Sequence, residues 1–104
     1  MKTLKECLKR NTIVMTKGIS EKIKENKKFY EEIKKCLDRH FENDFGELEE
    51  EDKQCNLIGI ESDLINDRVL SKYKTSEDYI YIITELYNYD DIDILTTILF
   101  PEEY

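Results

Sequence analysis

The spacing of apolar residues changes along this chain, and that change constrains the fold more than any other feature of the sequence. Between residues 19 and 41 the apolar side chains recur every three or four positions: Ile19, Ile23, Tyr30, Ile33, Leu37 and the pair His40 and Phe41. This period predicts one long amphipathic helix with Ser20 as its N-cap. After about residue 65 apolar and polar residues alternate, which predicts β-strands. The sequence therefore predicts a fold that contains both helices and a sheet.

Shorter patterns predict the remaining elements. A β-prone run predicts a first strand at 11–16, and an acidic start predicts a second helix at 47–60. Three further strands are predicted at 68–74, 78–88 and 92–100, and the last two would form an antiparallel hairpin. The residues expected to face inward from the second helix are Leu48, Asp52, Cys55 and Ile58 or Gly59. In the strand at 78–88 one face is expected to carry Ile80, Ile82 and Thr84.

The order of these elements predicts the fold class. A chain of 104 residues is expected to form one domain, spanning 1–104, with residues 1–10 as a short helix or a frayed arm. The order strand, two helices, three strands favours an α+β fold. We therefore predict two helices packed on one face of a three- to four-stranded antiparallel sheet.

Most kinds of catalytic chemistry have no basis in this sequence. Three glycines are too few to build a phosphate-binding loop or a dinucleotide fingerprint, so no cofactor is expected. The lone histidine, His40, follows Cys36 by four residues on the apolar side of the predicted helix, which favours a pair of core residues. The three cysteines lack the short spacings of a zinc site. We therefore predict no catalytic residue and no metal ligand, and a protein that is not an enzyme.

Acidic residues are concentrated in one short stretch. The chain has a net charge of −8, and the segment 42–52 contains Glu42, Asp44, Glu47, Glu49, Glu50, Glu51 and Asp52. A further group is formed by Asp90, Asp91 and Asp93. Carboxylates in the first turn of a helix stabilise it by roughly 0.3–1 kcal/mol each, so the run has a structural explanation. A rigid acidic surface also imitates a row of phosphates, and these ten residues are our candidates for binding a partner protein.

Basic residues gather on the predicted first helix. Its polar side carries Lys22, Lys24, Lys27, Lys28, Lys34 and Lys35. Glutamates at helical spacing alternate with these lysines, which is typical of a charged, solvated helix face. The lysines are nevertheless the candidates for binding nucleic acid if the protein contacts phosphates directly. The overall negative charge disfavours this second role.

The predicted location and partners follow from composition. The chain has no run of about 18 apolar residues, and its first residues lack the apolar core of a signal peptide, so we expect a cytoplasmic protein without membrane contact. The expected partner is a host protein, namely a nucleic-acid-binding enzyme or complex. A homodimer is also compatible with the sequence, because the hairpin rich in Ile and Tyr would be able to pair across a sheet edge.

Several segments together resemble a known group of proteins. They are "VMTKGI" (14–19), "DFGELEEEDK" (44–53), "RVL" (68–70) with Tyr73, "IITE" (82–85) and, most specifically, "TTILFPEEY" (96–104). They resemble proteins of roughly a hundred residues that are encoded on plasmids, integrative elements and prophages of Gram-positive bacteria, especially clostridia. Such proteins carry labels such as "plasmid-related protein" or "type I restriction endonuclease subunit M". The resemblance implies a mobile-element protein that acts in conjugation, phage life or host defence.

The methyltransferase label has no support in this chain. A DNA methyltransferase needs a glycine-rich cofactor segment and an Asn/Asp-Pro-Pro-aromatic motif, whereas the one proline here is Pro101 in "FPEEY". Three functions therefore stay open at the level of sequence. The first is an acidic inhibitor of a host nuclease or defence complex, of the anti-CRISPR or anti-restriction type. The second is a DNA-binding accessory protein, and the third is a small hydrolase that holds a metal with Asp90, Asp91 and Asp93 or with Glu47 and Glu51.

Overall fold

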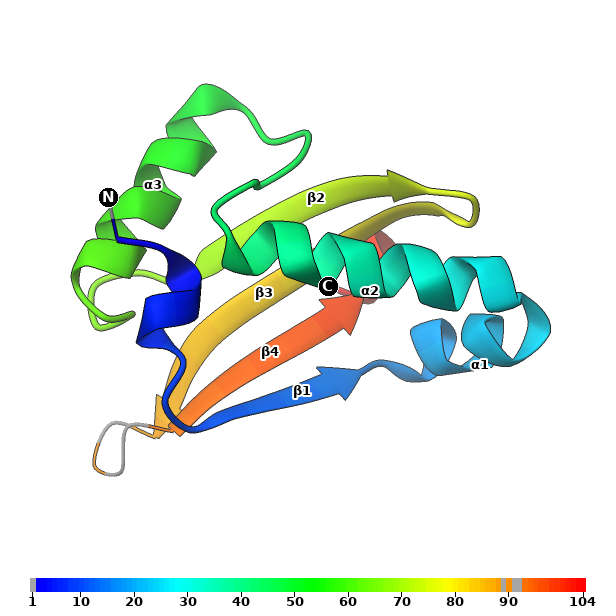
Figure 1. Cartoon of the computed structure of the whole chain (residues 1–104), viewed down its shortest axis with the longest axis horizontal. Coiled ribbons are helices and arrows are strands. Elements are labelled where there is room, and N and C mark those ends of the chain that lie inside the picture. The colour runs from blue at the N-terminus through cyan, green and yellow to red at the C-terminus, as the bar shows by residue number, and fades with distance from the viewer. Residues whose placement is uncertain (1, 89, 91–92) are drawn as a thin grey trace.

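Helices cover one face of a four-stranded sheet in the computed structural model, which describes residues 2–88, 90 and 93–104 (Figure 1). The α-helices are α1 (Lys17–Glu25), α2 (Lys27–Phe41) and α3 (Glu50–Glu61). The strands are β1 (Asn11–Met15), β2 (Val69–Thr75), β3 (Asp78–Asn88) and β4 (Asp93–Leu99). Short 3₁₀ helices, η1 (Leu4–Cys7) and η2 (Pro101–Glu103), stand near the two ends of the chain. The predicted α+β class is confirmed.

The sheet has the strand order β1-β4-β3-β2. Strand β3 is antiparallel to both of its neighbours, β2 and β4, as predicted, and β3 with β4 forms the predicted hairpin. Strand β1 is the exception because it lies parallel to β4. Three helices and two strands separate β1 from β4 in the chain, which leaves ample length for such a crossover. The hairpin occupies the centre of the sheet, so its strands have no free edge, and pairing of two copies through that hairpin is not available.

The predicted long helix is two helices, and Asn26 separates them. Its side-chain oxygen accepts hydrogen bonds from the backbone nitrogens of Lys28, at 3.1 Å, and Phe29, at 3.3 Å, which makes Asn26 the N-cap of α2. Because the chain leaves the helical conformation at Asn26, the side of the helix that faces the core is different before and after this residue. Phe29 is therefore fully buried, whereas Tyr30, predicted to face inward, is exposed. The first of the two helices is capped by Thr16, not by Ser20 as predicted.

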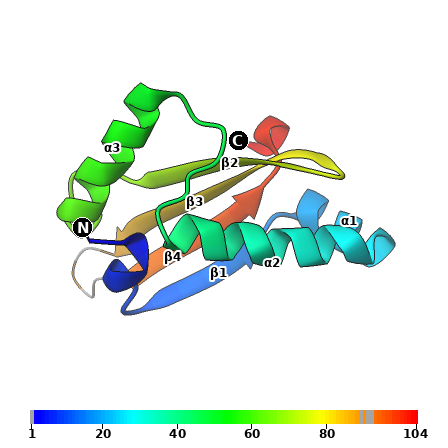
Figure 2. The same cartoon turned by 45° about the horizontal axis from the view of Figure 1, so that its top comes forward.

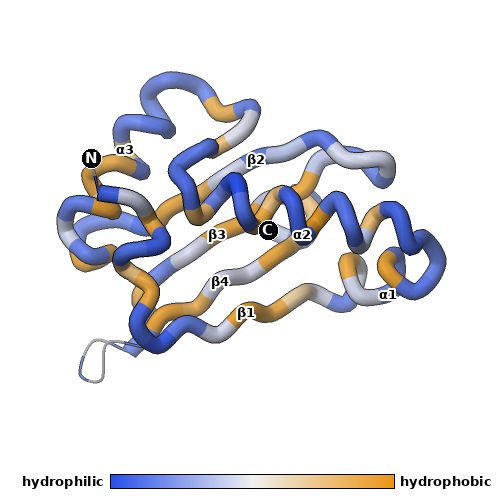
Figure 3. The backbone as a smooth tube through the Cα atoms, in the orientation of Figure 1, coloured by the Kyte–Doolittle hydropathy of each residue, from blue (hydrophilic) through white to orange (hydrophobic). Residues whose placement is uncertain are grey.

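The core consists of two clusters. One lies between the sheet and helices α1 and α2, and it contains Ile19, Phe29, Ile33, Cys36, Tyr73, Ile80, Ile82, Ile98 and Phe100. The other lies under η1 and α3, and it contains Leu4, Cys7, Phe45, Ile60, Leu64, Val69, Leu86 and Ile94. The face of β3 that carries Ile80, Ile82 and Thr84 is the one that packs under the helices, because all three are fully buried. Figure 3 shows hydrophobic segments along the strands and mainly hydrophilic turns along α2.

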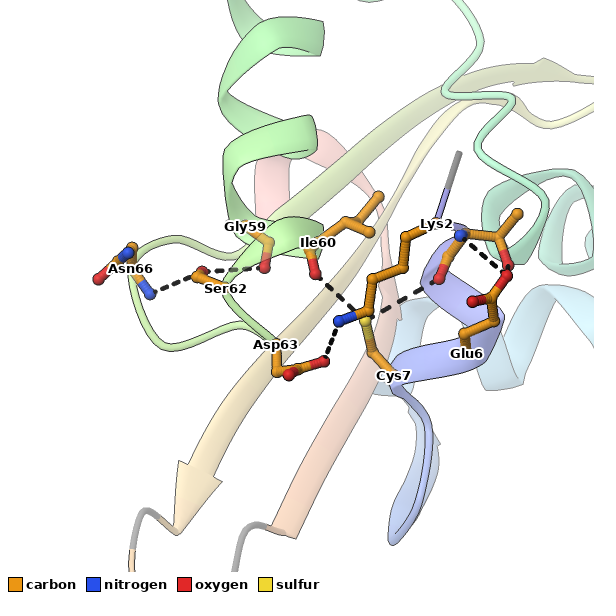
Figure 4. Close-up of polar contacts among 9 residues, drawn as sticks. Lys2, Glu6, Cys7, Gly59, Ile60, Ser62, Asp63 and Asn66 are labelled. Atoms are coloured by element: carbon orange, nitrogen blue, oxygen red, sulfur yellow. Dashed lines mark hydrogen bonds and ion pairs between the residues drawn. The ribbon is translucent and has the colours of Figure 1, made fainter.

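The N-terminal segment is a short helix that packs against the end of α3 (Figure 4). The thiol of Cys7 donates to the carbonyl oxygen of Ile60 at 3.5 Å, and the ammonium group of Lys2 forms an ion pair with Asp63. Leu4 of η1 is fully buried in the second cluster. The first residues therefore help to hold α3 in place.

Helix α3 begins three residues later than predicted, at Glu50. Its buried residues are Asn56, Gly59 and Ile60, so Gly59 and not Ile58 is the one of the two alternatives that faces inward. Asp52 and Cys55, predicted to face inward, are exposed. Gly59 permits the close contact with the strand that follows, because a Cβ atom there would lie 2.8 Å from the carbonyl oxygen of Asp67. This contact sets the rotation of α3 and turns Ile58 outward. Among the described residues, no helix is long and apolar enough to cross a membrane.

Candidate functional site

The first part of the acidic stretch is tied into the fold. The guanidinium group of Arg39 donates two hydrogen bonds to the carboxylate of Asp44, at 2.7 and 3.2 Å, and they lower the pKa of that carboxyl group. Glu42 lies 3.9 Å from the ammonium group of Lys5. These two acidic residues are therefore partly neutralised and belong to the turn after α2.

The aromatic-glycine pair inside the acidic stretch also serves the fold. Phe45 is buried in the second core cluster, and its carbonyl oxygen accepts a hydrogen bond from the backbone nitrogen of Lys72 at 3.1 Å. Gly46 has a φ of 72°, and a Cβ atom at this position would lie 2.0 Å from the carbonyl oxygen of Lys72. Only glycine tolerates this conformation and this approach together. The segment therefore pairs with the outer edge of β2.

The second part of the acidic stretch is free. Five carboxylates are exposed at the start of α3: Glu47, Glu49, Glu50, Glu51 and Asp52. Within the part of the chain that the structure describes, none of them takes part in an ion pair. Three of them lie in the first helical turn, where the positive end of the helix dipole stabilises negative charge. The dipole offsets only part of the charge, so the group projects a strong negative potential.

Exposed apolar side chains continue from these carboxylates along α3. Ile58 is 56% exposed and lines a shallow, open hollow of about 470 Å³ together with Gln54, Leu57, Glu61, Ser62 and Asn66. Ile65, just beyond the helix, is 64% exposed. We call the five carboxylates and this hollow the α3 surface. None of the five carboxylates lines the hollow, so this surface has an acidic end and an apolar end. Protein–protein interfaces combine apolar and charged areas in this way.

The other predicted acidic residues lie elsewhere. Asp93, at the start of β4, has a side chain that is only 14% exposed, and its carboxylate lies 2.8 Å from the Nε atom of Arg10. Asp90 is exposed in the turn between β3 and β4, and Asp91 falls outside the described residues. Figures 1 and 2 place the start of β4 far from the start of α3. The predicted partner-binding residues that the structure describes therefore do not form one surface.

The predicted lysines are divided between two helices. Lys22 and Lys24 lie on α1, and the other four, Lys27, Lys28, Lys34 and Lys35, lie on α2. Two of the six are paired, since Lys22 lies 3.6 Å from Glu25 and Lys34 lies 2.9 Å from Glu31. The break at Asn26 interrupts the continuous basic face that the sequence predicts.

The pair His40 and Cys36 lies in the core. The two ring nitrogens of His40 lie 2.6 Å from the hydroxyl oxygen of Ser71 and 2.9 Å from that of Thr84. Burial lowers the pKa of His40 to about 3 and raises the pKa of Cys36 to about 11. Both side chains are buried, so neither is in reach of a substrate. Among the residues that the structure describes, no group of three or more His, Cys, Asp or Glu side chains is placed to hold a metal ion.

Sequence reasoning missed the apolar part of the α3 surface because it left open whether Ile58 or Gly59 faces inward. A signal was present in the sequence. Leu57 and Ile60 are three residues apart and share one side of the helix, whereas Ile58 lies on another side, so the three cannot all reach the same core. One of them has to be exposed.

Comparisons with known proteins supply no relative. No family model matches this chain, and neither the curated proteins nor the solved structures contain a match. The resemblance to plasmid and prophage proteins stays a prediction.

Proposed function

We propose that this chain is a non-enzymatic binding protein of a mobile genetic element, and that it inhibits a host nucleic-acid-binding enzyme or defence complex. The observation that carries the proposal is the α3 surface, where five exposed carboxylates lie within six residues at the start of the helix that also exposes Ile58. The apolar hollow is shallow and open, which suits a protein surface better than a small substrate.

The carboxylates would bind where the partner binds nucleic acid. Groups that contact phosphates are lysines and arginines, and a compact row of negative charges is complementary to them. Such charges raise the rate of association more than they raise affinity. Ile58 would supply the desolvated contact that slows dissociation, because apolar anchors at the centre of an interface carry most of its free energy. The partner would thus be lined by basic residues around a small apolar pocket.

A direct interaction with nucleic acid is the alternative. All six predicted lysines are exposed, and four of them, Lys24, Lys27, Lys28 and Lys35, have no ion pair within the described residues. Phosphate contacts by these lysines would make binding strongly dependent on salt. The same experiment distinguishes the two functions.

The test is an affinity capture from host lysate, with and without nuclease treatment, followed by mass spectrometry. The proposal expects a protein partner that resists nuclease treatment. Reversing the charges of Glu47, Glu49, Glu50 and Glu51 to lysine should abolish its capture, and Ile58→Asp alone should weaken it at least tenfold, or about 1.4 kcal/mol. The purified partner should then lose its activity on nucleic acid when the wild-type chain is added.

A matched variant controls for net charge. Reversing Glu21, Glu25, Glu31 and Asp38, which are exposed on α1 and α2, changes the net charge equally but leaves the α3 surface intact. Capture should survive in this variant. If both variants lose the partner equally, or if every partner disappears on nuclease treatment, the α3 surface is not the contact. The second outcome would instead favour the lysines.

A further inference from the structure

The two edge strands of the sheet, β2 and β1, differ in whether their outward backbone groups are hydrogen-bonded. At the β2 edge the side chain of Asn56 acts in place of a neighbouring strand, because it accepts from the backbone nitrogen of Leu70 at 2.9 Å and donates to the carbonyl oxygen of Leu70 at 2.7 Å. Further along the same edge, the backbone nitrogen of Glu47 donates to the carbonyl oxygen of Lys72 at 2.8 Å. This edge is closed by the chain itself.

The other edge, β1, is open. Arg10 and Thr16 make backbone hydrogen bonds to β4, at 2.8 Å to Ile94 and 3.1 Å to Ile98. Bonding alternates along a strand, so the even-numbered residues of β1 face β4. The backbone N–H and C=O groups of Asn11, Ile13 and Met15 therefore point away from the sheet. Figure 1 shows no described element beside this edge.

The side chains of β1 lack the features that usually protect an edge strand. The strand contains no charged residue, no proline and no bulge. Ile13 and Met15 are 45% and 42% exposed on the side of the helices, and Val14 is exposed on the opposite face. Figure 3 shows this stretch as hydrophobic. Both faces of β1 thus carry exposed apolar side chains, as do strands that accept another strand.

Basic residues stand at both ends of this edge. No acidic residue occurs between Glu6 and Glu21, whereas Lys9 and Lys17 bracket the strand. Lys17 lies 4.0 Å from Glu21 of α1, yet its side chain stays 89% exposed. The acidic groups that other elements bring near this edge are engaged. Asp93 is paired with Arg10, and Glu103 accepts hydrogen bonds from Thr16 and Gly18. An incoming strand would therefore meet exposed ammonium groups at its two ends.

We propose that β1 binds an extended acidic segment of a partner protein, which adds to the sheet as a fifth strand. The segment would carry β-branched apolar residues in its centre and carboxylates at both ends, opposite Lys9 and Lys17. A second copy of this chain is a poor occupant. The antiparallel register that overlaps all five residues of two β1 strands places Ile13 opposite itself. It also brings Lys9, which precedes the strand, towards Lys17 at the start of α1 of the other copy, at both ends of the strand pair. Like charges that come together in this way destabilise the pair.

The test uses a displayed library of random ten-residue peptides selected against the intact protein. We expect the enriched peptides to have a β-branched centre with Asp or Glu on both sides. Binding of a synthetic enriched peptide should slow amide hydrogen exchange at Asn11, Ile13 and Met15 in NMR spectra. It should leave the amides of α3 unchanged, because α3 packs against β2 at the opposite side of the sheet.

Two variants check the site. Ile13→Pro removes an outward N–H group and should abolish binding. Lys9→Glu/Lys17→Glu keeps the strand and should weaken binding about tenfold, whereas Lys24→Glu/Lys27→Glu, with the same change in net charge, should not. Four results would overturn the proposal. They are a selection without enriched peptides, enriched peptides without acidic residues, slower exchange only at amides outside β1, and a wild-type dimer through β1. The α3 charge-reversal variant retains β1 and should therefore bind the peptide as wild type does. Failure of the β1 proposal is thus distinguishable from failure of the function proposed above.

Discussion

His40 connects a line of buried polar side chains that crosses the sheet. From α2 its ring contacts Ser71 of β2 and Thr84 of β3, and Thr84 lies 2.8 Å from Thr96 of β4, which donates to Asn11 of β1 at 2.9 Å. Every strand thus contributes one polar group on the face that the helices cover. Among the described residues, no buried side-chain nitrogen or oxygen lacks a partner. Such a network favours one register over others, because a slipped strand would leave these groups unpaired.

Protonation of His40 should make the protein sensitive to mild acid. Burial lowers its pKa from 6.5 to about 3, so as the pH falls below 6.5 the unfolded chain binds a proton that the folded chain does not. The contribution of neutral His40 to stability is therefore fully present above pH 6.5, and it is lost as the pH falls from 6.5 towards 3. We expect the free energy of unfolding to drop by about 2 kcal/mol between pH 7.5 and pH 5. Urea unfolding at the two pH values measures this drop.

The control for that experiment is His40→Gln, which keeps a neutral hydrogen-bonding side chain. Its unfolding free energy should change much less between the same pH values. Asp44 and Asp63 also contribute, but their pKa values are lowered from 3.8, so their effect falls at lower pH. An equal loss in wild type and variant would show that another group is responsible.

The three thiols should differ in reactivity because they differ in burial. Cys55 is exposed on α3, whereas Cys7 and Cys36 are buried and burial raises the pKa of both thiol groups. The thiolate is the reactive form, so only Cys55 should react with iodoacetamide at pH 8 in the folded protein. Mass spectrometry should find one modification per chain before unfolding in urea and three after it. Early labelling of Cys7 would mean that η1 detaches from α3.

At the level of elements, the sequence was most informative where one pattern repeats. The strand at 78–88 was predicted with the bounds that the structure has, because alternation over eleven residues defines the strand and divides its side chains between two faces. The helix break at Asn26 was missed because its side chain gains partners that are remote in sequence. Its amide nitrogen donates to Glu77, 2.7 Å away in the turn between β2 and β3. The parallel pairing of β1 also depends on distant residues, so no local pattern predicts it.

The candidate site was predicted in part for the same reason. Charge can be counted in a sequence, so the exposed carboxylates of α3 were identified. Their division into a tied group and a free group depends on Arg39 and on the approach of Gly46 to β2, which only the folded chain shows. The outward turn of Ile58 depends on the contact between Gly59 and Asp67. Tertiary contacts, not local propensity, decide which members of a charged or apolar run face a partner.

Asn56 should be the most important polar residue of α3. Its amide pairs with both backbone groups of Leu70, so Asn56→Ala removes two hydrogen bonds and leaves the β2 edge unpaired. We expect the free energy of unfolding to fall by about 1–3 kcal/mol. Chemical unfolding measures this, and hydrogen exchange should show faster exchange at Leu70. Gln54→Ala, an exposed change on the same helix, should cost less than about 0.5 kcal/mol and serves as the control. Equal costs would mean that the Asn56 amide does not hold the edge.

At the scale of the whole molecule, charge is segregated. Residues 1–41 contain most of the lysines, and the carboxylates are concentrated beyond residue 41. The fold places the free carboxylates on α3, over β2, and the basic ends of β1 at the opposite edge of the sheet. One molecule thus presents an acidic surface and a basic edge that are separated by the width of the sheet. Two different partners would be able to bind at the same time.

The same charges should keep the protein monomeric in spite of its open β1 edge. In the full-overlap register of two β1 strands, Lys9 and Lys17, which flank the strand, come near each other at both ends. Lys9→Glu converts these two repulsions into two attractions. Each exposed ion pair contributes about 0.2–1 kcal/mol, so we expect dimerisation to strengthen by about one to two orders of magnitude once repulsion is also removed. Sedimentation velocity over a range of concentrations should then show a dimer for the variant and a monomer for wild type.

A second substitution makes the argument specific to this register. Lys9→Glu/Lys17→Glu places carboxylates opposite each other, so the double variant should return to a monomer although its net charge has moved further from zero. Lys24→Glu, which changes the net charge as much as Lys9→Glu does, should stay monomeric. If the double variant dimerised as well as the single one, overall charge and not the register would govern association. If wild type were itself a dimer through β1, the repulsion between Lys9 and Lys17 would be too weak to protect the edge.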